Sequence, residues 1–534
     1  MVSDPDVVII GGGLLGATAS VLLQRRNVRA LVLEARAKDQ VPKAFVGEAV
    51  TEGTSLVLRN ELGLTDWLAA NCFRKYGLAF VVQPRNQPAP QRIEDCHEFM
   101  MSQILLRGTS GATKRLIPVY HVDRKTLDGH VAQVSQDAGI PWIHDARVQS
   151  VEIDDTGQQH RVHYTVDGEE HTVNCRWVID CSGRRTLLAR QLGEVRRIPE
   201  LDTASVWNRF SDVNNDPDRH RTFRGIDRRT QTTHFSGEGF WAWWIHQSDQ
   251  QTSVGISWDN RLHQPDLKSK DKGFWEMLRK FPAAANLLEG ARPLEPYQYF
   301  GHLAYRCDRW ISPKGYCMIG DASWFADALY STGLDNACRQ LMNAVPLICG
   351  AVQGRRPPMQ IVEQLNSDFD HSVRSIFKIN VFKYQHAWKS PYLLAQTAIY
   401  ELGGEIAQMH RLQNSRRWTP DVIARHYRMQ WHSQKHLESL ERFLDNGLAD
   451  ADRDLKPGVP LLKKAVLIDR LLYYLTWPIW RIPGGVPFLM RFVQTWAYVE
   501  RLAQRVLYWP DVLHWMALPP GATRSSPRLI SEQK

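Results

Sequence analysis

The 534-residue sequence lacks the patterns that mark metal-binding, membrane-spanning and nucleic-acid-binding proteins. No apolar run reaches the roughly 18 residues that cross a bilayer. No basic run is dense enough for a nucleic-acid surface, so nucleic acid is not expected as a partner. The eight cysteines form no CxxC pair, which argues against a metal site and predicts reduced, buried thiols at Cys72, Cys96, Cys175, Cys181, Cys307, Cys317, Cys338 and Cys349.

Charge and the N-terminus set further limits. A formal net charge of +9, from 66 Lys and Arg against 57 Asp and Glu, attracts acidic partners such as a carrier protein or anionic lipid. The same charge also fits a mildly basic soluble protein. The N-terminus starts a strand at once and shows no basic segment, apolar stretch and cleavage site of a secretory signal. We therefore expect a cytoplasmic protein.

Residues 6–34 follow the order strand, turn, helix and strand, the context in which glycines bind a dinucleotide. Gly11 permits a tight turn, Gly13 lets a pyrophosphate approach the backbone, and Gly16 lets the helix pack closely on the sheet. The helix N-terminus offers free amides to the phosphates. Glu34, at the end of the second strand, can accept hydrogen bonds from a ribose diol. A glycine turn with a purely structural role is the alternative.

Two later segments favour FAD over other dinucleotides. One apolar strand ends at Asp180, and another ends at Asp321 before a loop and a long helix that starts near Gly333. The Asp321 carboxylate suits a hydroxyl of the ribityl chain, and the helix N-terminus suits the electron-rich edge of a reduced isoalloxazine. Arg124 lies at a predicted helix start between these segments, and we expect it to contact the cofactor.

This order of elements resembles the flavoprotein monooxygenase superfamily with the p-hydroxybenzoate hydroxylase type of fold. The resemblance implies an α/β fold in which a Rossmann-like FAD-binding domain carries an inserted, substrate-covering β-sheet and is followed by a mostly helical C-terminal region. The expected segments are residues 1–80, 105–190 and 300–354 for the FAD-binding domain, 81–104 and 191–299 for the inserted sheet, 355–518 for the helical region, and 519–534 for a disordered tail.

Three motifs narrow the resemblance to the flavin-dependent halogenases. Residues 46–64 begin with VGE and are similar to the family segment that precedes its catalytic lysine. The stretch FRKYGLAF then places Lys75 where that lysine lies. Trp241, Trp243 and Ile245 resemble the family's WxWxIP signature. The chain departs from the family at His246, which replaces the proline of this signature.

The resemblance implies that reduced FAD, dioxygen and chloride or bromide generate hypohalous acid, and that Lys75 guides this oxidant to the substrate. A lysine in an apolar passage can hydrogen-bond to the acid or form a haloamine, and burial favours the neutral, nucleophilic amine. The alternative is a lysine whose stem packs on aromatic side chains while its ammonium reaches water. The two interpretations differ in whether the Lys75 amine is buried.

The same resemblance implies further site residues. It assigns Glu48 of the VGE motif to the cofactor and the backbone amides of Thr332 and Gly333 to the halide. It assigns Trp241 and Trp243 to a wall that separates flavin from substrate and discourages direct oxygen transfer. Core packing of the inserted sheet is the simpler explanation of both tryptophans, since strand alternation places them on one face.

The substrate is expected to be a phenol, resorcinol or pyrrole rather than free tryptophan. Family members that act on free tryptophan carry a glutamate where this chain has Tyr330. Members that act on phenols or pyrroles, often attached to a carrier protein or a lipid-like chain, more often have an aromatic residue there. An electron-rich ring also activates itself towards electrophiles. In the same loop Ala328 replaces a family proline.

The C-terminal region alternates basic residues with tryptophans at Trp477, Trp480, Trp496, Trp509 and Trp515. Such amphipathic material can lie on a membrane surface or dock an acidic carrier protein. It more often packs on the body of the enzyme. The C-terminal region therefore has three interpretations: peripheral contact with the inner membrane face, docking of a carrier-tethered substrate, and simple packing on the enzyme.

Together these observations predict an FADH2- and O2-dependent halogenase of secondary metabolism that acts on an electron-rich, lipophilic or carrier-tethered aromatic. Because the sequence shows no second nucleotide-binding fingerprint, a separate flavin reductase would supply the reduced FAD. The first alternative is a monooxygenase or desaturase of the same fold, in which Lys75 has another role. The second is a flavin-binding protein without catalysis.

Overall fold

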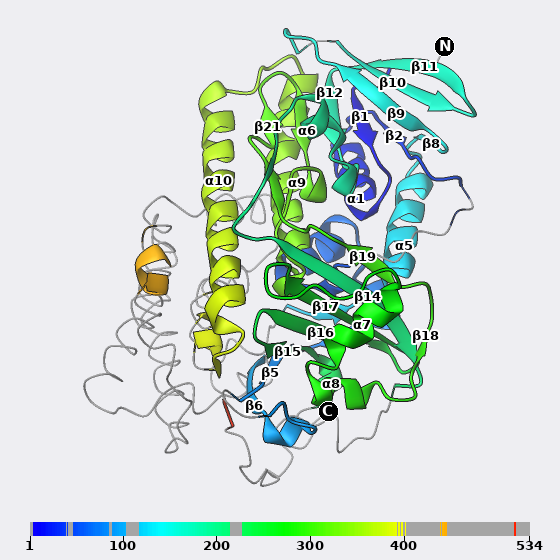
Figure 1. Cartoon of the computed structure of the whole chain (residues 1–534). Helices are drawn as coiled ribbons and strands as arrows, with labels where there is room; N and C mark the ends of the chain where they lie inside the picture. The colour runs from blue at the N-terminus through cyan, green and yellow to red at the C-terminus, as the bar shows by residue number, and fades with distance from the viewer. Residues whose placement is uncertain are drawn as a thin grey trace, which may run out of the picture.

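The computed structural model describes residues 4–38, 40, 46–84, 88–102, 117–157, 159–213, 227–391, 393–395, 397–398, 401, 438, 440–445 and 517–518. The expectations for the basic and tryptophan-rich segment 463–515 and for the tail 519–534 lie outside these residues. Figure 1 shows the described part as two units, one above the other, with long helices along one side.

Within the described residues, the first unit is built on a six-stranded sheet in the order β21-β22-β12-β1-β2-β8. Neighbouring strands are parallel except for β21 and β22. Every residue of β1 and β2 is buried, as expected for aliphatic strands that are covered on both faces. The strands are β1 (Val7–Ile10), β2 (Ala30–Leu33), β8 (Trp142–Ile143), β12 (Trp177–Asp180), β21 (Ile311–Ser312) and β22 (Tyr316–Met318).

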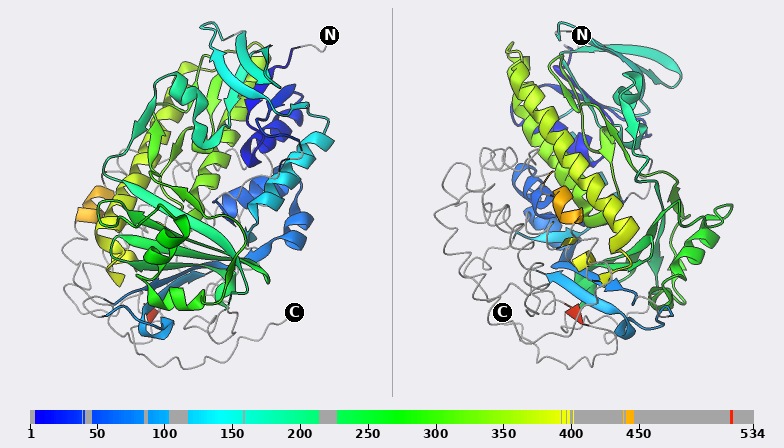
Figure 2. Two further views of the ribbon diagram at one scale, coloured as in Figure 1. Left: turned by 45° about the vertical axis from the view of Figure 1, so that its right-hand side comes forward. Right: turned by 60° about the vertical axis from the view of Figure 1, so that its left-hand side comes forward.

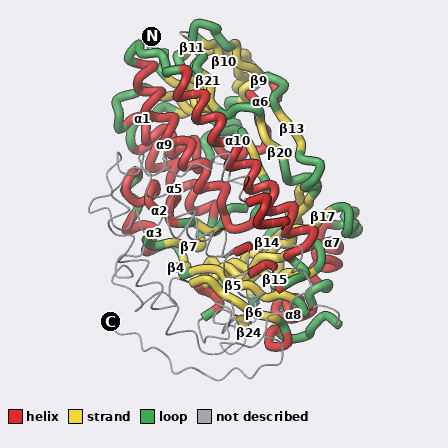
Figure 3. The backbone as a smooth tube through the Cα atoms, turned by 90° about the vertical axis from the view of Figure 1, so that its left-hand side faces the viewer, coloured by secondary structure: helices red, strands yellow, loops and turns green. Residues whose placement is uncertain are grey.

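Helices cover this sheet and join it to the rest of the molecule. Helix α1 (Leu14–Gln24) follows β1 and contacts α5 (Arg124–Asp137), where the Ser20 and Ser135 hydroxyls lie 2.7 Å apart. Helices α9 (Thr332–Val352) and α10 (Met359–Phe382) run side by side along the molecule (Figure 3). A π-helical turn, η8 (Lys383–Ala387), continues α10 towards the second unit.

The second unit is a large sheet, which lies in the lower half of both views in Figure 2. Its described strands follow the order β18-β14-β17-β16-β15-β5-β6-β24, with β19 also paired to β14. Its strands are β5 (Gly77–Val82), β6 (His97–Ser102), β14 (Thr203–Ser211), β15 (Gln231–Gly237), β16 (Phe240–Ser248), β17 (Gln251–Asp259), β18 (Arg292–Pro293), β19 (Gln298–Phe300) and β24 (Ala517–Leu518). The long central strands are almost fully buried because both faces of the sheet are covered.

Smaller elements complete the described fold. A three-stranded sheet of β3 (Ala49–Val50), β7 (Val119–His121) and β4 (Phe73–Lys75) lies between the two units. Two further three-stranded sheets combine β9 (Arg147–Glu152), β10 (His160–Val166) and β11 (Glu169–Cys175), and β13 (Val195–Arg197), β20 (Tyr305–Cys307) and β23 (Trp324–Phe325). The remaining helices and turns include α2 (Glu52–Leu56), η1 (Val57–Glu61), α3 (Thr65–Asn71), η4 (Gly183–Arg185), α6 (Leu187–Gln191), α7 (Lys270–Leu278), α8 (Pro282–Leu287) and η7 (Leu329–Ser331).

Alternation along β16 divides the hydrophobic interior into two main clusters. Trp241 and Trp243 belong to the cluster that also contains the first unit and the long helices. Phe240 and Trp244 point to the other face and pack with helices α7 and α8. The expectation that Trp241 and Trp243 share a face is confirmed, and that face looks towards the first unit.

The structure differs from the sequence-based boundaries in two places. Strand β5 starts at Gly77, within the segment assigned to the FAD-binding domain, because residues 77–82 pair in parallel with β15. Ala517–Leu518, at the end of the segment expected to be helical, pairs with Phe99 and Glu98 as a strand. Among the described residues, no helix combines the length and apolarity that crossing a bilayer requires.

A fully buried ion pair in the large sheet gives a test of the fold. Arg228 Nη2 lies 2.6 Å from Glu98 Oε1, and both side chains are at most 1% exposed. We expect Arg228→Met to destabilise the protein by about 3–5 kcal/mol, because Glu98 then stays buried without this counter-charge. The double variant with Glu98→Leu should recover most of the loss. Arg92→Met, which breaks the exposed Arg92–Asp95 pair, should change stability by less than about 1 kcal/mol in the same thermal and urea unfolding experiments.

Candidate functional site

The glycine-rich turn after β1 has the geometry that a dinucleotide requires. Gly11 has a φ of +97°, which side chains rarely adopt, and a Cβ on Gly16 would lie 1.9 Å from the Gly11 carbonyl oxygen. A Cβ on Gly13 would meet nothing within 4 Å. The first and third glycines are therefore required by the fold itself, whereas Gly13 faces open space at the N-terminus of α1. This open cradle fits the phosphates of FAD.

Glu34 closes the same turn. Its carboxylate accepts hydrogen bonds from the Gly12 amide at 2.7 Å and from the Arg36 amide at 2.8 Å, and it forms an ion pair with the Arg36 guanidinium. Burial raises the pKa of Glu34, but the bonds from Arg36 outweigh this effect and hold the pKa below its usual value. An ionised carboxylate here is the acceptor that a ribose diol needs.

Asp321 lies at the C-terminal side of β22 beside two arginines. Burial raises the pKa of the Asp321 carboxyl, and Arg184 and then Arg124 oppose this rise. Arg124 forms an ion pair with Asp128 at 2.7 Å and donates to the Val46 carbonyl at 2.8 Å. The structure therefore brings Asp321, Arg124 and the VGE segment to one place, between the first turn of α5 and the start of α9.

The Arg184 side chain was not identified from the sequence. Its guanidinium lies 4.4 to 5.1 Å from the ring centroids of Phe300, Tyr305 and Phe325, so three aromatic rings hold it in place. It also donates to the carbonyls of His302 and Leu303. The signal for this position was the SGRRT run after Asp180, but the run alone does not reveal which arginine turns inwards.

The loop before α9 has an unusual backbone. Tyr330 and Ser331 both adopt left-handed conformations, with φ values of 59° and 58°, and α9 starts at Thr332. A Cβ on Gly333 would meet no atom within 4 Å. A first pocket is lined by Gly320, Asp321, Trp324, Phe325, Ala326, Asp327, Leu329, Thr332, Gly333, Ile376 and Asn380. Thr332 and Gly333, whose amides the resemblance assigns to the halide, thus line the pocket that contains Asp321.

A second pocket lies across the same loop. It is lined by Val46, Gly47, Glu48, Leu78, Thr232, His234, Trp241, Trp243, Ile245, Ala328, Tyr330 and Ser331. The VGE segment, the two signature tryptophans and Tyr330 therefore line one cavity. The loop of residues 328–331 contributes to both pockets, because Leu329 lines the first and Ala328, Tyr330 and Ser331 line the second.

Lys75 is the last residue of β4 and is only 5% exposed. Its positive charge contributes to lowering the pKa of both His121 and His234, which places its ammonium within electrostatic range of the second pocket. The interpretation in which the Lys75 ammonium reaches bulk water does not fit this burial.

His121 and His234 are neutral imidazoles. Burial, followed by the charge of Lys75, lowers the pKa of His234 to about 3 and the pKa of His121 well below its usual value. His121 places Nδ1 2.9 Å from the His246 carbonyl oxygen and Nε2 2.9 Å from the Thr232 hydroxyl. The carbonyl can only accept, so Nδ1 of His121 carries the proton and Nε2 accepts from Thr232.

Asp327 connects the loop to both the sheet and the helices. The Tyr384 hydroxyl, from η8, donates to Asp327 Oδ2 at 2.7 Å and accepts from Trp241 Nε1 at 2.9 Å. The Ser257 hydroxyl lies 2.8 Å from the Tyr384 hydroxyl. Burial raises the pKa of Asp327 to about 6, although these hydrogen bonds oppose the rise. Neither Asp327 nor Tyr384 was identified from the sequence.

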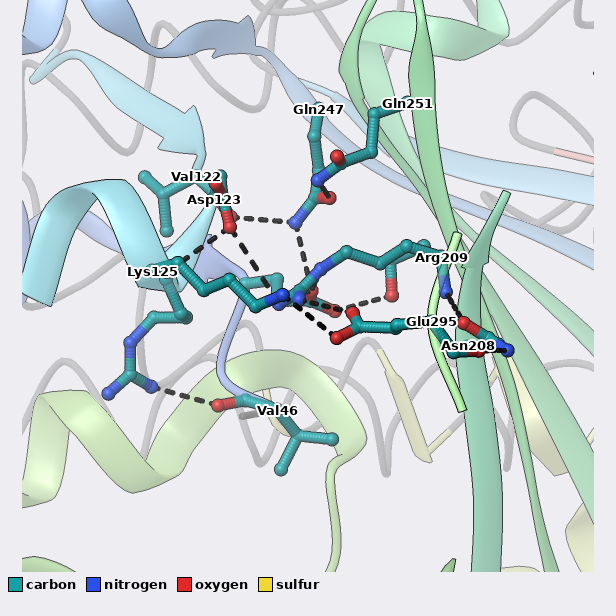
Figure 4. A network of polar contacts seen from close by, with 12 residues as sticks. Val46, Val122, Asp123, Lys125, Asn208, Arg209, Gln247, Gln251 and Glu295 are labelled. Atoms are coloured by element: carbon teal, nitrogen blue, oxygen red, sulfur yellow. Dashed lines mark hydrogen bonds and ion pairs between the residues drawn. The ribbon is translucent and has the colours of Figure 1, made fainter. Parts of the chain in front are cut away.

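Glu48 lies in an ion network that fastens the first unit to the large sheet. Figure 4 shows Arg209, Gln247 and Glu295 of this network. The Glu48 carboxylate is 2.8 Å from Arg209 Nη2 and 2.9 Å from Gln247 Nε2, and it also accepts from the Ser253 hydroxyl. Arg209 reaches Glu295 at 2.7 Å. Burial lowers the pKa of Arg209, but the carboxylates around it raise the pKa above its usual value. The assignment of Glu48 to FAD remains a prediction, since the contacts found for its carboxylate are with protein.

Comparison with protein families identifies the first two thirds of the chain. Residues 4–361 match the FAD binding domain family. The chain is 26% identical over 351 residues to a 1H-pyrrole-2-carbonyl-[peptidyl-carrier protein] chlorinase of Pseudomonas fluorescens, a match that covers 62% of this chain and 73% of the relative. It is 27% identical to the tetracycline 7-halogenase of Kitasatospora aureofaciens and 26% identical to a flavin-dependent halogenase of Dictyostelium discoideum. These matches cover 64% and 62% of this chain, but only 62% and 57% of those two relatives.

Solved structures show the same fold. Halogenase PltM, in complex with phloroglucinol and FAD, superimposes with a TM-score of 0.70 at 20% identity, over 90% of this chain and 98% of the other. The flavin-dependent brominase Bmp2 gives a TM-score of 0.57 at 21% identity, over 84% of this chain and 99% of the other.

The open space at Gly13 leads to a binding test. We expect Gly13→Val to weaken FAD binding by about tenfold or more, because its side chain would occupy the phosphate cradle while its backbone angles suit any residue. Fluorescence titration with FAD measures this change. Gly129→Ala is the matched control, since the added Cβ also meets nothing within 4 Å, and it should bind FAD normally. An unchanged affinity in Gly13→Val would contradict the assignment.

The raised pKa of Asp327 leads to a test of stability against pH. The folded-state pKa of about 6 exceeds the usual 3.8, so the folded protein binds a proton that the unfolded chain releases. This contribution, on the order of 3 kcal/mol, is fully present below about pH 4 and is lost as the pH rises through about 6. The difference in apparent Tm between the wild type and Asp327→Asn should fall over this interval and then level off. A Tm difference that stays constant or increases over this interval would contradict the raised pKa of Asp327.

Proposed function

Because the chain belongs to the FAD binding domain family and, within it, to the flavin-dependent halogenases, we propose that it chlorinates or brominates an electron-rich aromatic compound. The observation that carries the proposal is the burial of Lys75 beside the pocket formed by the VGE segment, Trp241, Trp243 and Tyr330. Guided halogenation needs an amine that is shielded from water and lies between the flavin site and the substrate pocket.

The residues of the first unit fit FAD. The cradle at Gly13 would hold the phosphates, Glu34 the ribose, and Asp321 with Arg124 the chain that leads to the flavin ring. Reduced FAD with dioxygen supplies the oxidising power that turns a halide into an electrophile. The left-handed turn at Tyr330 and Ser331 directs the chain into α9, whose first amides at Thr332 and Gly333 are suited to an anion.

Lys75 would direct the electrophilic halogen across the second pocket. Its amine can donate a hydrogen bond to hypohalous acid. Alternatively, its neutral form can attack the halogen and break the halogen–oxygen bond, and the displaced hydroxide takes a proton from the nitrogen and leaves as water, giving a haloamine. The imidazoles of His121 and His234 are neutral, so neither forms an ion pair with a carboxylate. The pocket therefore lacks an imidazolium–carboxylate pair at these positions, which would attract water. Trp241 and Trp243 line the wall and exclude water from the path.

The proposed substrate is a phenol, resorcinol or pyrrole. One relative acts on a carrier-bound pyrrole, and a structure of similar fold holds phloroglucinol. Tyr330 supplies an aromatic wall here, with no carboxylate at this position to receive a cationic amino acid. The substrate would be lipophilic or tethered to a carrier protein, and a separate reductase would deliver reduced FAD. We place the enzyme in the cytoplasm, where it could touch the inner membrane face.

Replacement of Lys75 tests the proposal. With chemically reduced FAD, bromide and phloroglucinol as the probe, we expect Lys75→Met to lower the rate of bromination about 10²- to 10⁴-fold, because the positioned amine is lost. FAD affinity and oxygen consumption should stay within about twofold of the wild type. Mass spectrometry of the product, through its bromine isotope pattern, measures the rate.

Lys272→Met on the exposed side of α7 is the matched control and should behave as the wild type. Bromination at a comparable rate in Lys75→Met would refute the role assigned to this amine. A wild-type enzyme that consumes oxygen and yields a hydroxylated product regardless of halide would instead indicate a monooxygenase.

A further inference from the structure

The π-helical turn η8 brings two successive side chains to the loop between the pockets. Tyr384 binds Asp327 through its hydroxyl, and the Lys383 ammonium lies 4.1 Å from the centroid of the Tyr330 ring. π-Helical turns are uncommon and recur at functional sites. The turn therefore contacts the loop on both sides of Ala328, although it lies more than fifty residues later in the sequence.

Lys383 is completely buried. Its side chain is 0% exposed, and its ammonium forms an ion pair with Glu401. Burial of a charge costs free energy unless the charge is paired. A buried lysine without a structural or functional role would therefore only lower the stability of the fold. Lys383 also contributes to the low pKa of His234, after burial and Lys75, which places its charge close to the wall of the second pocket.

Tyr330 occupies a conformation that needs support. A residue other than glycine in the left-handed region costs roughly 1 kcal/mol, and here Tyr330 and Ser331 adopt it in succession. Such strain persists only where the surroundings fix it. The Tyr330 ring meets Phe80 and His234 edge-on, with centroids 5.9 and 5.7 Å apart, and the Lys383 ammonium lies 4.1 Å from its centroid. The Tyr330 hydroxyl bonds to Glu401, the same carboxyl group that pairs with Lys383.

We propose that Lys383 is a positioning residue, which holds the Tyr330 ring by a cation–π contact and thereby fixes the turn that shapes the second pocket and leads to Thr332 and Gly333. Glu401 neutralises the buried ammonium, so the cation stays in place without disturbing the pocket. The inference rests on the proposed function, because it assigns the turn a role in binding halide and aromatic substrate. Lys383 itself touches neither.

A double-mutant cycle tests this inference. The variants are Lys383→Met, which keeps the length of the side chain but removes the charge, Tyr330→Leu, which removes the ring, and the combination of both. Bromide is titrated into the FAD-loaded, oxidised enzyme and followed by flavin absorbance, and phloroglucinol binding is measured by calorimetry. We expect each single variant to weaken at least one of these affinities about five- to thirtyfold, the effect of losing a desolvated cation–π contact.

The double variant should be no weaker than the worse single variant, because both changes remove the same contact. Lys383→Arg, which keeps a cation, should retain most of the affinity. Lys389→Met is the matched control, since Lys389 pairs with Glu238 at 2.8 Å at a partly exposed site, and it should bind as the wild type does.

Two results would overturn the proposal. In the first, Lys383→Met leaves both bromide and phloroglucinol affinities unchanged. In the second, the single effects multiply in the double variant, so that Lys383 acts independently of Tyr330. If Lys383→Met does not retain FAD, the cycle is run with Lys383→Gln in its place and with Lys383→Arg as the reference that keeps the cation. These titrations need no halogenated product, so a failure of the proposed reaction is distinguishable from a failure of this inference.

Discussion

The ion pair between Glu48 and Arg209 is the constraint on which the site depends. The second pocket has walls from the first unit and from the large sheet, so its shape depends on the position of the two units relative to each other. Glu48 and Arg209 are both almost completely buried and join these units directly, and Glu295 and Gln247 complete the network. A buried ion pair contributes little net stability against an apolar pair of equal size, but it tolerates few alternative arrangements. We therefore regard this ion pair as a determinant of how the two units are positioned relative to each other.

The charges around the pocket follow from this enclosure. Lys75 and Lys383 are both buried, and both lower the pKa of His234, after burial itself. Protonated histidines beside them would add repulsion in a place where water cannot screen it. The imidazoles remain neutral and serve as hydrogen-bonding walls, as the fixed contacts of His121 show. A cavity of this kind favours a halide or an ionisable phenol over a cationic amine.

Sequence patterns revealed the parts of the site that are local in the chain. The strand, the glycine spacing and Glu34 lie within one short segment, and the alternation of Trp241 and Trp243 is a property of any strand. Contacts that depend on how distant elements pack against each other could not be predicted from the sequence. Nothing near Tyr330 in the sequence indicates that Lys383 reaches its ring, and nothing near Asp327 indicates Tyr384. The partner of Glu48 is likewise 161 residues away, so the motif alone could not reveal the ion pair with Arg209.

The departure at His246 illustrates why a motif can lose a residue and keep its geometry. The His246 carbonyl accepts a hydrogen bond from His121 Nδ1, and a proline would offer the same carbonyl. The His246 ring meets Phe73 edge-on, with centroids 4.8 Å apart, and Phe73 starts the strand that ends at Lys75. The substitution thus retains the acceptor that orients His121 and adds a contact to the strand that carries the lysine. The backbone carbonyl at this position orients His121, and a backbone carbonyl is present whichever side chain the position carries.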